Sequence, residues 1–285
     1  MYVIAGVSGH TGAVVADTLL SQGKKVRVIV RNAEKGAAWQ KKGAEVAVAD
    51  LGDVAAMTKA LTGATGAYLL SPPNFAAQDF IADRKAMLGN LAKAITASGL
   101  KSLVFLSSVA AQHPAGTGPI VTVHHAEQLL GKLAPSVTFV RAAYFLENWG
   151  SVIPVAKAQG VLPHFGAVDV KFPQVCTKDI GEAAVKALLN PADGTRVVEL
   201  AGKEDWSVQD VAAAVGTLLG KPVQAVSAPV EAAKAGLMQA GVPETMAGLY
   251  AEMYAGIGKG LIAFEKPASL TRGTTALVDA LRPLV

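Results

Sequence analysis

The first half of the chain alternates short apolar strands with helical patterns, and this alternation restricts the fold more than any other feature. Strand-like stretches rich in Val, Ile and Leu recur at intervals of about 20 to 35 residues, with helical spacing of apolar residues between them. Parallel strands joined by right-handed helical crossovers and buried on both faces fit such a repeat. We therefore predict an α/β fold with a doubly wound parallel sheet. The strands read YVIAG, KVRVIV, AEVAVAD, GAYLLS, SLVFLSS and SVTFVRA.

The rhythm weakens after Asn148, where several Gly and Pro residues interrupt the pattern before a strong helix resumes in TKDIGEAAVKALLN. We therefore divide the chain into a domain of residues 1–148 and a smaller C-terminal α/β lobe of residues 149–285. Within that lobe, about 172–200 are expected to pack back on the first sheet. In the first domain, helices are expected at about 13–22, 53–61, 76–98 and 123–133.

Composition excludes several classes of protein. Hydrophobic residues make up 51% of the chain and charged residues 17%, which is typical of a large packed core and not of a disordered chain. No apolar run reaches the roughly 18 residues that span a bilayer, so we expect a soluble, cytoplasmic protein. The net charge of +4 comes without a basic run, which argues against a nucleic-acid ligand. No Cys/His cluster has zinc spacing, no metal is expected, and the single Cys176 is interpreted as an inert core residue.

The sequence GVSGHTG follows the first strand directly and opens the first helix. In that position Gly6 can make the tight turn, Gly9 can let the backbone approach a pyrophosphate, and Gly12 can let helix and strand pack closely. The helix N-terminus adds unpaired amides and a positive dipole end. A nucleophilic Ser8 would need a glycine two residues later, where His10 stands. The loop therefore predicts a Rossmann fold that binds a dinucleotide.

The end of the second strand indicates which dinucleotide. An NAD-binding protein usually has an acidic residue there for the ribose 2′-hydroxyl, but this chain reads VIVRNAEKG, with Arg31 and Lys35. A guanidinium matches a 2′-phosphate with two hydrogen bonds, so NADPH is favoured over NADH. Asp50, which closes the third strand, either meets the adenine or caps the helix that starts near Asp53.

Together these motifs resemble the NmrA-like, atypical members of the short-chain dehydrogenase/reductase superfamily. That group includes type-2 NAD(P)H:quinone oxidoreductases and NADPH-binding regulators. The resemblance rests on GVSGHTG, VRNAEKG, ADLGD, AYLLSPPN, LVFLSSVAA, HHAEQLL, FVRAAYFLENW and, weakly, RGTTALVDAL. These motifs cover most of the chain in the expected order.

The resemblance implies roles for individual residues. The pyrophosphate would be held by Gly6, Gly9, His10, Thr11 and Gly12. The 2′-phosphate would meet Arg31, and the adenine Asp50 and Leu51. The ribose and nicotinamide would lie beside Ser71, Pro72, Ser107 and Ser108. The mouth of the substrate pocket would be formed by Tyr144, Phe145 and Asn148. Most of these positions follow parallel strands, where ligands of open α/β sheets bind.

One departure from the active dehydrogenases affects the chemistry. Those enzymes carry a Tyr-x-x-x-Lys pair about a dozen residues after the fifth-strand serine, whereas this region reads GPIVTVHHAEQLLGK. No tyrosine lies between Tyr68 and Tyr144. A ketone gives a strongly basic alkoxide that needs a positioned acid, so ordinary ketone chemistry is disfavoured.

Three functional interpretations remain. In the first, hydride passes to a quinone-like or other conjugated acceptor, and the proton comes from water, from His124 or His125, or through Ser107. Adjacent helical residues point about 100° apart, so at most one of the two histidines faces the nicotinamide. In the second, the protein is a non-catalytic NADPH-binding redox sensor with a protein partner. In the third, it is a nucleotide-sugar epimerase or reductase.

Two further matters stay open. The helical stripe of Met246, Leu249, Tyr250, Met253, Tyr254 and Ile257 is either a face packed on the core or a wall over a substrate pocket, and in a sensor it would be an interaction surface. The oligomeric state, including a homodimer, is not determined by the sequence. The favoured interpretation is an oxidoreductase that uses NADPH and a small-molecule acceptor.

Overall fold

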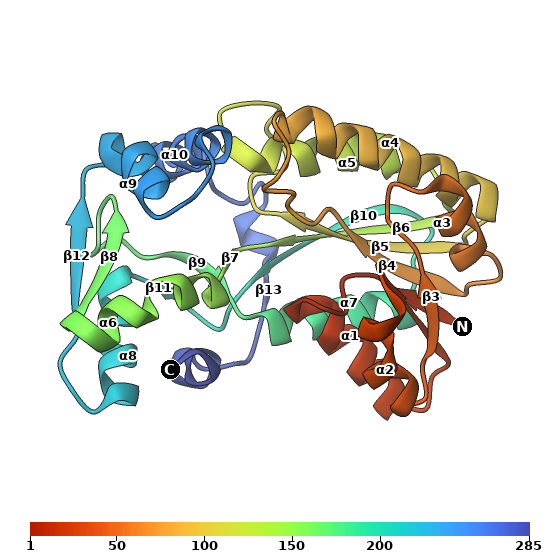
Figure 1. Cartoon of the computed structure of the whole chain (residues 1–285), viewed down its shortest axis with the longest axis horizontal. Helices are drawn as coiled ribbons and strands as arrows, with labels where there is room; N and C mark the ends of the chain where they lie inside the picture. Colours follow the sequence, from red (N-terminus) through yellow and green to blue (C-terminus); the bar gives the residue numbers. More distant parts are fainter.

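The computed structural model describes all 285 residues and is built around one large sheet (Figure 1). Its eight strands run in the spatial order β13-β10-β6-β5-β4-β1-β2-β3, and every adjacent pair is parallel. This is the predicted doubly wound sheet. The strands are β1 (Tyr2–Ile4), β2 (Val26–Val30), β3 (Glu45–Val48), β4 (Gly66–Leu70), β5 (Ser102–Ser108), β6 (Ser136–Ala142), β10 (Gly194–Ala201) and β13 (Thr271–Arg272).

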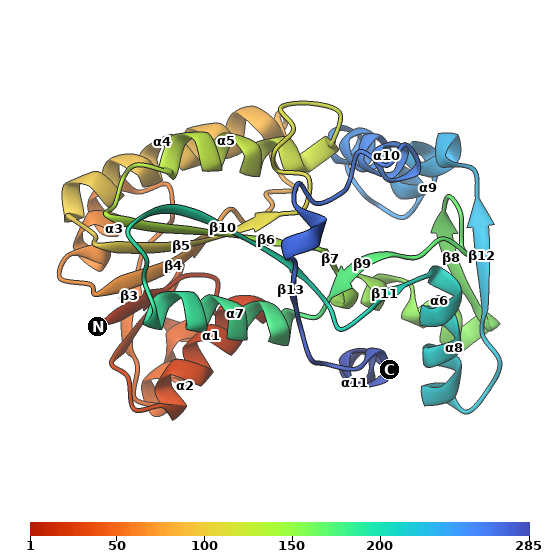
Figure 2. The same ribbon diagram turned by 180° about the vertical axis from the view of Figure 1, so that it is seen from behind.

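Helices cover both faces of this sheet, because crossovers between parallel strands must run over one face or the other (Figures 1 and 2). One face carries α3 (Val54–Leu61), α4 (Phe80–Ser98) and α5 (Val121–Leu130), with a buried core that includes Leu88, Leu91 and Phe105. The other carries α1 (His10–Ser21), α2 (Ala37–Lys41) and α7 (Thr177–Leu189), with a separate core around Val15 and Ile180.

Helix α4 begins four residues later than the sequence pattern predicts. The side chain of Asp79 accepts a hydrogen bond from the backbone N–H of Ala82 at 2.9 Å and so caps the helix. Before it, Asn74 Oδ1 accepts from the N–H of Ala76 at 3.3 Å and holds a turn. Residues 76–79 therefore belong to the loop after β4 and not to the helix.

The second half of the chain contributes to the large sheet and also forms a smaller lobe. Strand β10 pairs with β6, Leu200 lying opposite Ala142, and β13 then pairs with β10 through Leu200 and Thr271. The lobe contains a three-stranded sheet of β7 (Tyr144–Phe145), β9 (Phe172–Val175) and β11 (Asp205–Trp206), and a two-stranded sheet of β8 (Val161–Phe165) and β12 (Gln224–Ala228). Its helices are α6 (Ile153–Gln159), α8 (Val208–Leu219), α9 (Ala233–Gln239), α10 (Glu244–Gly258) and α11 (Leu277–Leu281).

The lobe has its own hydrophobic core, which includes Trp149, Trp206 and the buried Cys176. Six short 3-10 turns complete the chain, namely η1 (Ala33–Gly36), η2 (Gly118–Ile120), η3 (Leu146–Ser151), η4 (Val230–Ala232), η5 (Pro267–Ser269) and η6 (Arg282–Leu284). None of the helices combines the length and the apolar character needed to cross a membrane.

Candidate functional site

The loop between β1 and α1 has the geometry that its glycines predict. Gly6 adopts a left-handed conformation with φ of +72°, and Gly9 is the N-cap residue of α1. A Cβ on Gly12 would lie only 2.4 Å from the carbonyl oxygen of Ala5, so only glycine lets α1 approach β1 this closely. The first turn of α1 therefore presents free backbone amides next to the end of β1.

Two side chains of this turn differ in their surroundings. His10 is exposed at the start of α1. Thr11 is buried, and its hydroxyl accepts a hydrogen bond from the hydroxyl of Tyr68 on β4 at 2.9 Å. Burial raises the pKa of Tyr68, so this phenol stays protonated and remains the donor. The Thr11 side chain thus ties α1 to the sheet, and its backbone amide is the group left for an anion.

A first cavity of about 260 Å³ opens beside this loop, along the carboxyl ends of β1, β2, β3 and β4. We call it the nucleotide cavity. Six of the residues expected to bind cofactor line it, namely Gly6, Arg31, Lys35, Asp50, Leu51 and Pro72. Both basic side chains are exposed, and the Lys35 backbone is fixed because its N–H donates to Asn32 Oδ1 at 3.1 Å. The cavity therefore has a cationic end at β2.

The sequence left two roles open for Asp50, contact with the adenine and capping of the helix near Asp53. Asp53 caps α3, with its side chain accepting from the N–H of Ala56 at 3.0 Å. Asp50 lines the nucleotide cavity, and its Oδ1 accepts from the N–H of Gly52 at 2.8 Å. Asp50 is thus available to a ligand through its remaining oxygen.

Arg84 of α4 reaches the nucleotide cavity, although the sequence analysis did not single it out. It is only 9% exposed, forms an ion pair with Asp83 and donates to the carbonyl oxygen of Pro72 at 2.9 Å. It thereby fixes the loop that follows β4. The sequence does indicate that Arg84 is buried, because it lies midway between Phe80 and Leu88 on the apolar stripe of α4. Ser8, Pro73, Asn74 and Met87 are further lining residues that were missed.

These features fit an extended dinucleotide. The turn at Gly6 and the α1 amides suit a pyrophosphate, and the cationic end suits a further phosphate. Ser71, at the end of β4, has a buried hydroxyl without a hydrogen-bond partner in the protein. An unpaired buried hydroxyl is costly, so a ligand group that bonds to it would be stabilising.

A second cavity, of about 250 Å³, lies at the carboxyl ends of β5 and β6. We call it the apolar cavity. Ser108 and the three residues predicted for the substrate pocket, Tyr144, Phe145 and Asn148, line it, and Ser107 does not. Tyr250, Met253 and Ile257 form its wall from α10, whereas Met246 of the same helix is fully buried. The apolar stripe of α10 therefore both packs on the core and walls the cavity.

Aromatic side chains support the apolar cavity from the side of the smaller lobe. Tyr144 packs against Trp149 and Phe172, with ring centroids 5.8 Å apart in each case. His164 stacks on Phe172 at 6.4 Å and meets Tyr254 edge to face at 5.7 Å. Burial lowers the pKa of His164 to about 4, so its ring is neutral at neutral pH. This wall of the cavity is therefore apolar and uncharged.

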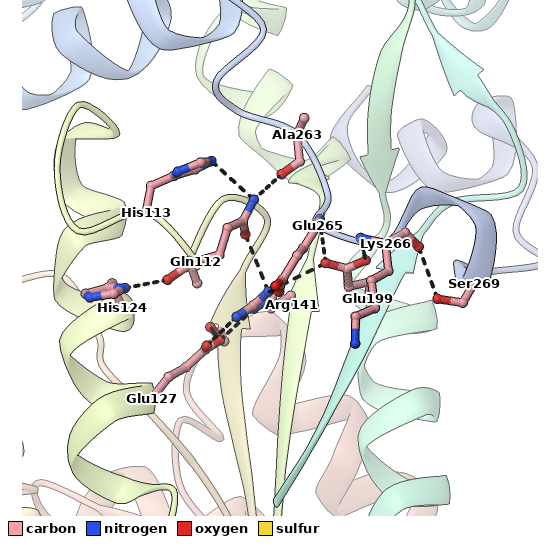
Figure 3. Close-up of polar contacts among 12 residues, drawn as sticks. Gln112, His113, His124, Glu127, Arg141, Glu199, Ala263, Glu265, Lys266 and Ser269 are labelled. Atoms are coloured by element: carbon pink, nitrogen blue, oxygen red, sulfur yellow. Dashed lines mark hydrogen bonds and ion pairs between the residues drawn. The ribbon is translucent and has the colours of Figure 1, made fainter.

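The two candidate catalytic histidines line neither cavity. His124 donates from Nδ1 to the carbonyl oxygen of Ala111 at 2.8 Å, which fixes its ring beside the loop after β5 (Figure 3). Burial, with the positive charges of Lys85 and His124 as smaller causes, lowers the pKa of His125. His125 is thus held mostly neutral next to α4. As proton sources, both stay predictions.

Ser107 belongs to a buried ionic cluster centred on Arg141 of β6 (Figure 3). Arg141 donates to both carboxylate oxygens of Glu127, at 2.9 and 2.7 Å, and to Glu265 at 2.7 Å. Ser107 donates to the same Glu127 at 2.6 Å, and Glu199 lies 3.6 Å from Arg141. Burial lowers the pKa of Arg141, but its bonds to Glu127 and Glu265 outweigh this and raise it above its ordinary value.

This cluster also anchors the segment that follows α10. Glu199 accepts from the backbone N–H groups of Glu265 and Lys266, both at 2.8 Å. Gln112 donates to the carbonyl oxygen of Ala263 at 2.9 Å. Ser107 and Glu127 therefore belong to the contacts that hold the segment after α10 against the large sheet. Ser108, the next residue along β5, lines the apolar cavity.

Comparison with protein families gives one match that extends over most of the chain. The model of the NmrA-like family matches residues 2–264. This range includes every residue that lines the two cavities. The strand β13 and the helix α11 lie outside it and line neither cavity.

Individual relatives match most or all of the chain. Quinone oxidoreductase 2 of Escherichia coli K12 is 28% identical over 294 residues, covering 100% of this chain and 98% of the relative. NAD(P)H azoreductase of Xenophilus azovorans is 24% identical over 255 residues, covering 90% and 86%. Among solved structures, the NADPH-dependent quinone oxidoreductase of Escherichia coli complexed with NADPH is 27% identical, with a TM-score of 0.83 and coverage of 100% and 99%.

Proposed function

The chain belongs to the NmrA-like family, and on that basis we propose that it is an NADPH-dependent oxidoreductase that transfers hydride to a quinone-like or other conjugated acceptor. The reductase activity and NADPH agree with the relatives, one named as a quinone oxidoreductase and one as an azoreductase. The choice of acceptor rests on the apolar cavity.

The observation that carries the proposal is the placement of the two cavities along one edge of the sheet. The nucleotide cavity lies at the ends of β1 to β4, and the apolar cavity at the ends of β5 and β6. In the spatial order of the strands these groups are neighbours. A dinucleotide bound at one end of the edge can therefore present its other end to an apolar, aromatic-lined space, which suits a flat conjugated molecule.

Each part of the cofactor has residues that would hold it. The amides of the first turn of α1 would bind the pyrophosphate, Arg31 and Lys35 the 2′-phosphate, and Asp50 with Leu51 the adenine. Ser71 and the Pro72 backbone, which Arg84 fixes, would border the ribose and nicotinamide. When bound, NADPH supplies a hydride to the acceptor.

The chain itself then has to orient the acceptor, exclude water and accommodate the negative charge that hydride transfer creates. Phe145, Phe172 and Met253 offer flat and flexible apolar surface for the first two tasks. A conjugated acceptor spreads the charge over several atoms, so it does not require the Tyr/Lys pair that α5 lacks.

An oxidation assay tests the proposal. NADPH is mixed with a panel of quinones, azo dyes and simple ketones, with NADH in parallel, and loss of the reduced cofactor is followed by absorbance. We expect turnover with quinones or azo dyes, little with simple ketones, and a preference for NADPH. Tight NADPH binding without turnover on any acceptor would contradict the proposal and favour a redox sensor.

Arg31→Asp tests the assignment of the 2′-phosphate. Losing one or two charge-assisted hydrogen bonds should weaken NADPH binding by roughly ten- to hundred-fold, as calorimetry or fluorescence titration can measure. Binding of NADH should change far less, because it lacks that phosphate. Lys24→Asp makes the same change of charge at an exposed site between α1 and β2 and should leave both affinities nearly unchanged. An equal loss for both cofactors in Arg31→Asp would show that the assignment is wrong.

A further inference from the structure

The apolar cavity contains few groups that could bond to a charged product. Of its 13 lining residues, only Ser108, Tyr144, Asn148 and Tyr250 carry polar side chains. Hydride transfer to a conjugated acceptor leaves a negative charge on an oxygen or nitrogen atom of that acceptor. In a cavity of low polarity such a charge is costly unless a hydrogen-bond donor meets it.

Three phenol groups gather on one side of the cavity. Tyr144 comes from β7, and Tyr250 and Tyr254 come from successive turns of α10, four residues apart. Burial, with the nearby Tyr254 as a smaller cause, raises the pKa of Tyr144. Tyr254 is further held by the rings of His164 and Phe165, at 5.7 and 5.6 Å. Aromatic packing therefore fixes both Tyr144 and Tyr254 beside the cavity.

Tyr250 differs from this pair. It lines the cavity, and no hydrogen bond to another side chain affects its hydroxyl. Burial raises its pKa, so the phenol carries its proton at neutral pH and is available as a hydrogen-bond donor. Ser108 also lines the cavity, but an aliphatic hydroxyl is a much weaker acid than a phenol.

We propose that Tyr250 donates a hydrogen bond, and then its proton, to the atom of the acceptor that becomes negatively charged, with Tyr144 and Tyr254 as positioning residues. This proposal rests on the proposed function. It assigns to α10 of the smaller lobe the proton donor that α5 of the sheet domain lacks.

The step balances with the hydride of NADPH. The acceptor would gain a hydride with its two electrons while NADPH, losing a C–H bond, would be oxidised to NADP+. The Tyr250 O–H bond would break as its proton moves to the charged oxygen or nitrogen. The product is the dihydro form of the acceptor. The Tyr250 phenolate then regains a proton from water at the open side of the cavity.

The test uses a pair of probes that need no cofactor turnover. 2-Naphthol imitates the phenolic product, and naphthalene has the same ring system without the hydroxyl group. Binding of each is measured by calorimetric titration. In Tyr250→Phe we expect 2-naphthol to bind about ten-fold more weakly and naphthalene to bind as in the unaltered protein. With quinone and NADPH, kcat should fall about a hundred-fold with little change in KM.

Three variants make the result specific. Tyr2→Phe removes a phenol from β1, far from the cavity, and should change neither binding nor kcat. Tyr254→Phe should reduce 2-naphthol binding less than Tyr250→Phe, because it acts only by positioning. Ser108→Ala should lower kcat less than Tyr250→Phe does, because an aliphatic hydroxyl is a weaker acid than a phenol. Circular dichroism checks that each variant is folded.

Two outcomes would overturn the proposal. One is unchanged 2-naphthol binding in Tyr250→Phe, and the other is a loss of naphthalene binding equal to that of 2-naphthol, which would indicate a packing role. Failure of the proposed function looks different. In that case 2-naphthol binding depends on Tyr250, while NADPH is not oxidised with any acceptor.

Discussion

Arg141→Ala is expected to lower the free energy of unfolding by about 3–5 kcal/mol, the cost of breaking a buried ion pair by removing one partner. The side chain of Arg141 is 6% exposed, and those of Glu127 and Glu199 are 8% and 6% exposed. Without the guanidinium these two carboxylates stay buried near each other with no cation, and Glu265 loses its 2.7 Å contact. Urea unfolding followed by circular dichroism measures the effect.

Arg282→Ala is the matched control for this variant. Arg282 forms an ion pair with Asp279, but both side chains are about two-thirds exposed. Exposed pairs contribute less than about 1 kcal/mol, so stability should hardly change. Comparable losses in the two variants would show that the Arg141 cluster does not stabilise the fold as we describe.

Gly12→Ala is expected to weaken NADPH binding by more than ten-fold and to lower the free energy of unfolding by about 1–3 kcal/mol. The new methyl group would lie 2.4 Å from Ala5 O and 2.5 Å from Gly6 C, both of which are backbone atoms that cannot swing aside. Helix α1 must therefore move away from β1, and its first amides move with it. Calorimetric titration with NADPH and thermal unfolding measure the two effects.

Gly89→Ala provides the control on α4. A Cβ at Gly89 would meet no atom within 4 Å, so the only expected effect is a gain of about 0.5–1 kcal/mol from helix propensity. Cofactor binding should not change. If Gly12→Ala bound NADPH like the unaltered protein, close packing of α1 on β1 would not be what forms the phosphate site.

Sequence reasoning was accurate where neighbouring residues determine the outcome. The strands of the first half are apolar and β-branched, and the GVSGHTG loop carries its own turn and helix start, so both could be predicted. The predicted start of α4 was wrong. Residues 76–78 favour a helix, but the side chains of Asn74 and Asp79 accept hydrogen bonds from nearby backbone N–H groups instead. Side-chain capping overrode propensity there.

The residues that were missed depend on contacts between distant parts of the chain. Arg84 meets the carbonyl oxygen of Pro72 across the loop between β4 and α4, a contact that helical spacing does not predict. The stripe on α10 could be read as core or as cavity wall, since its neighbours Tyr144 and Phe145 lie about a hundred residues earlier in the sequence. Helical spacing shows that such a face is buried but not what covers it.

The parallel pairing of the large sheet has a consequence for how the chain folds during synthesis. No two neighbouring strands of this sheet form a hairpin, and Ser136 of β6 finds its partner Gly194 only after 58 more residues have been made. Until then the outer edge of β6, a strand whose residues are all buried in the finished protein, remains open. Contacts of such long range slow folding and expose edges that can aggregate. The N-terminal half therefore leaves the ribosome with an unpaired strand that only the residues from β10 onward can cover.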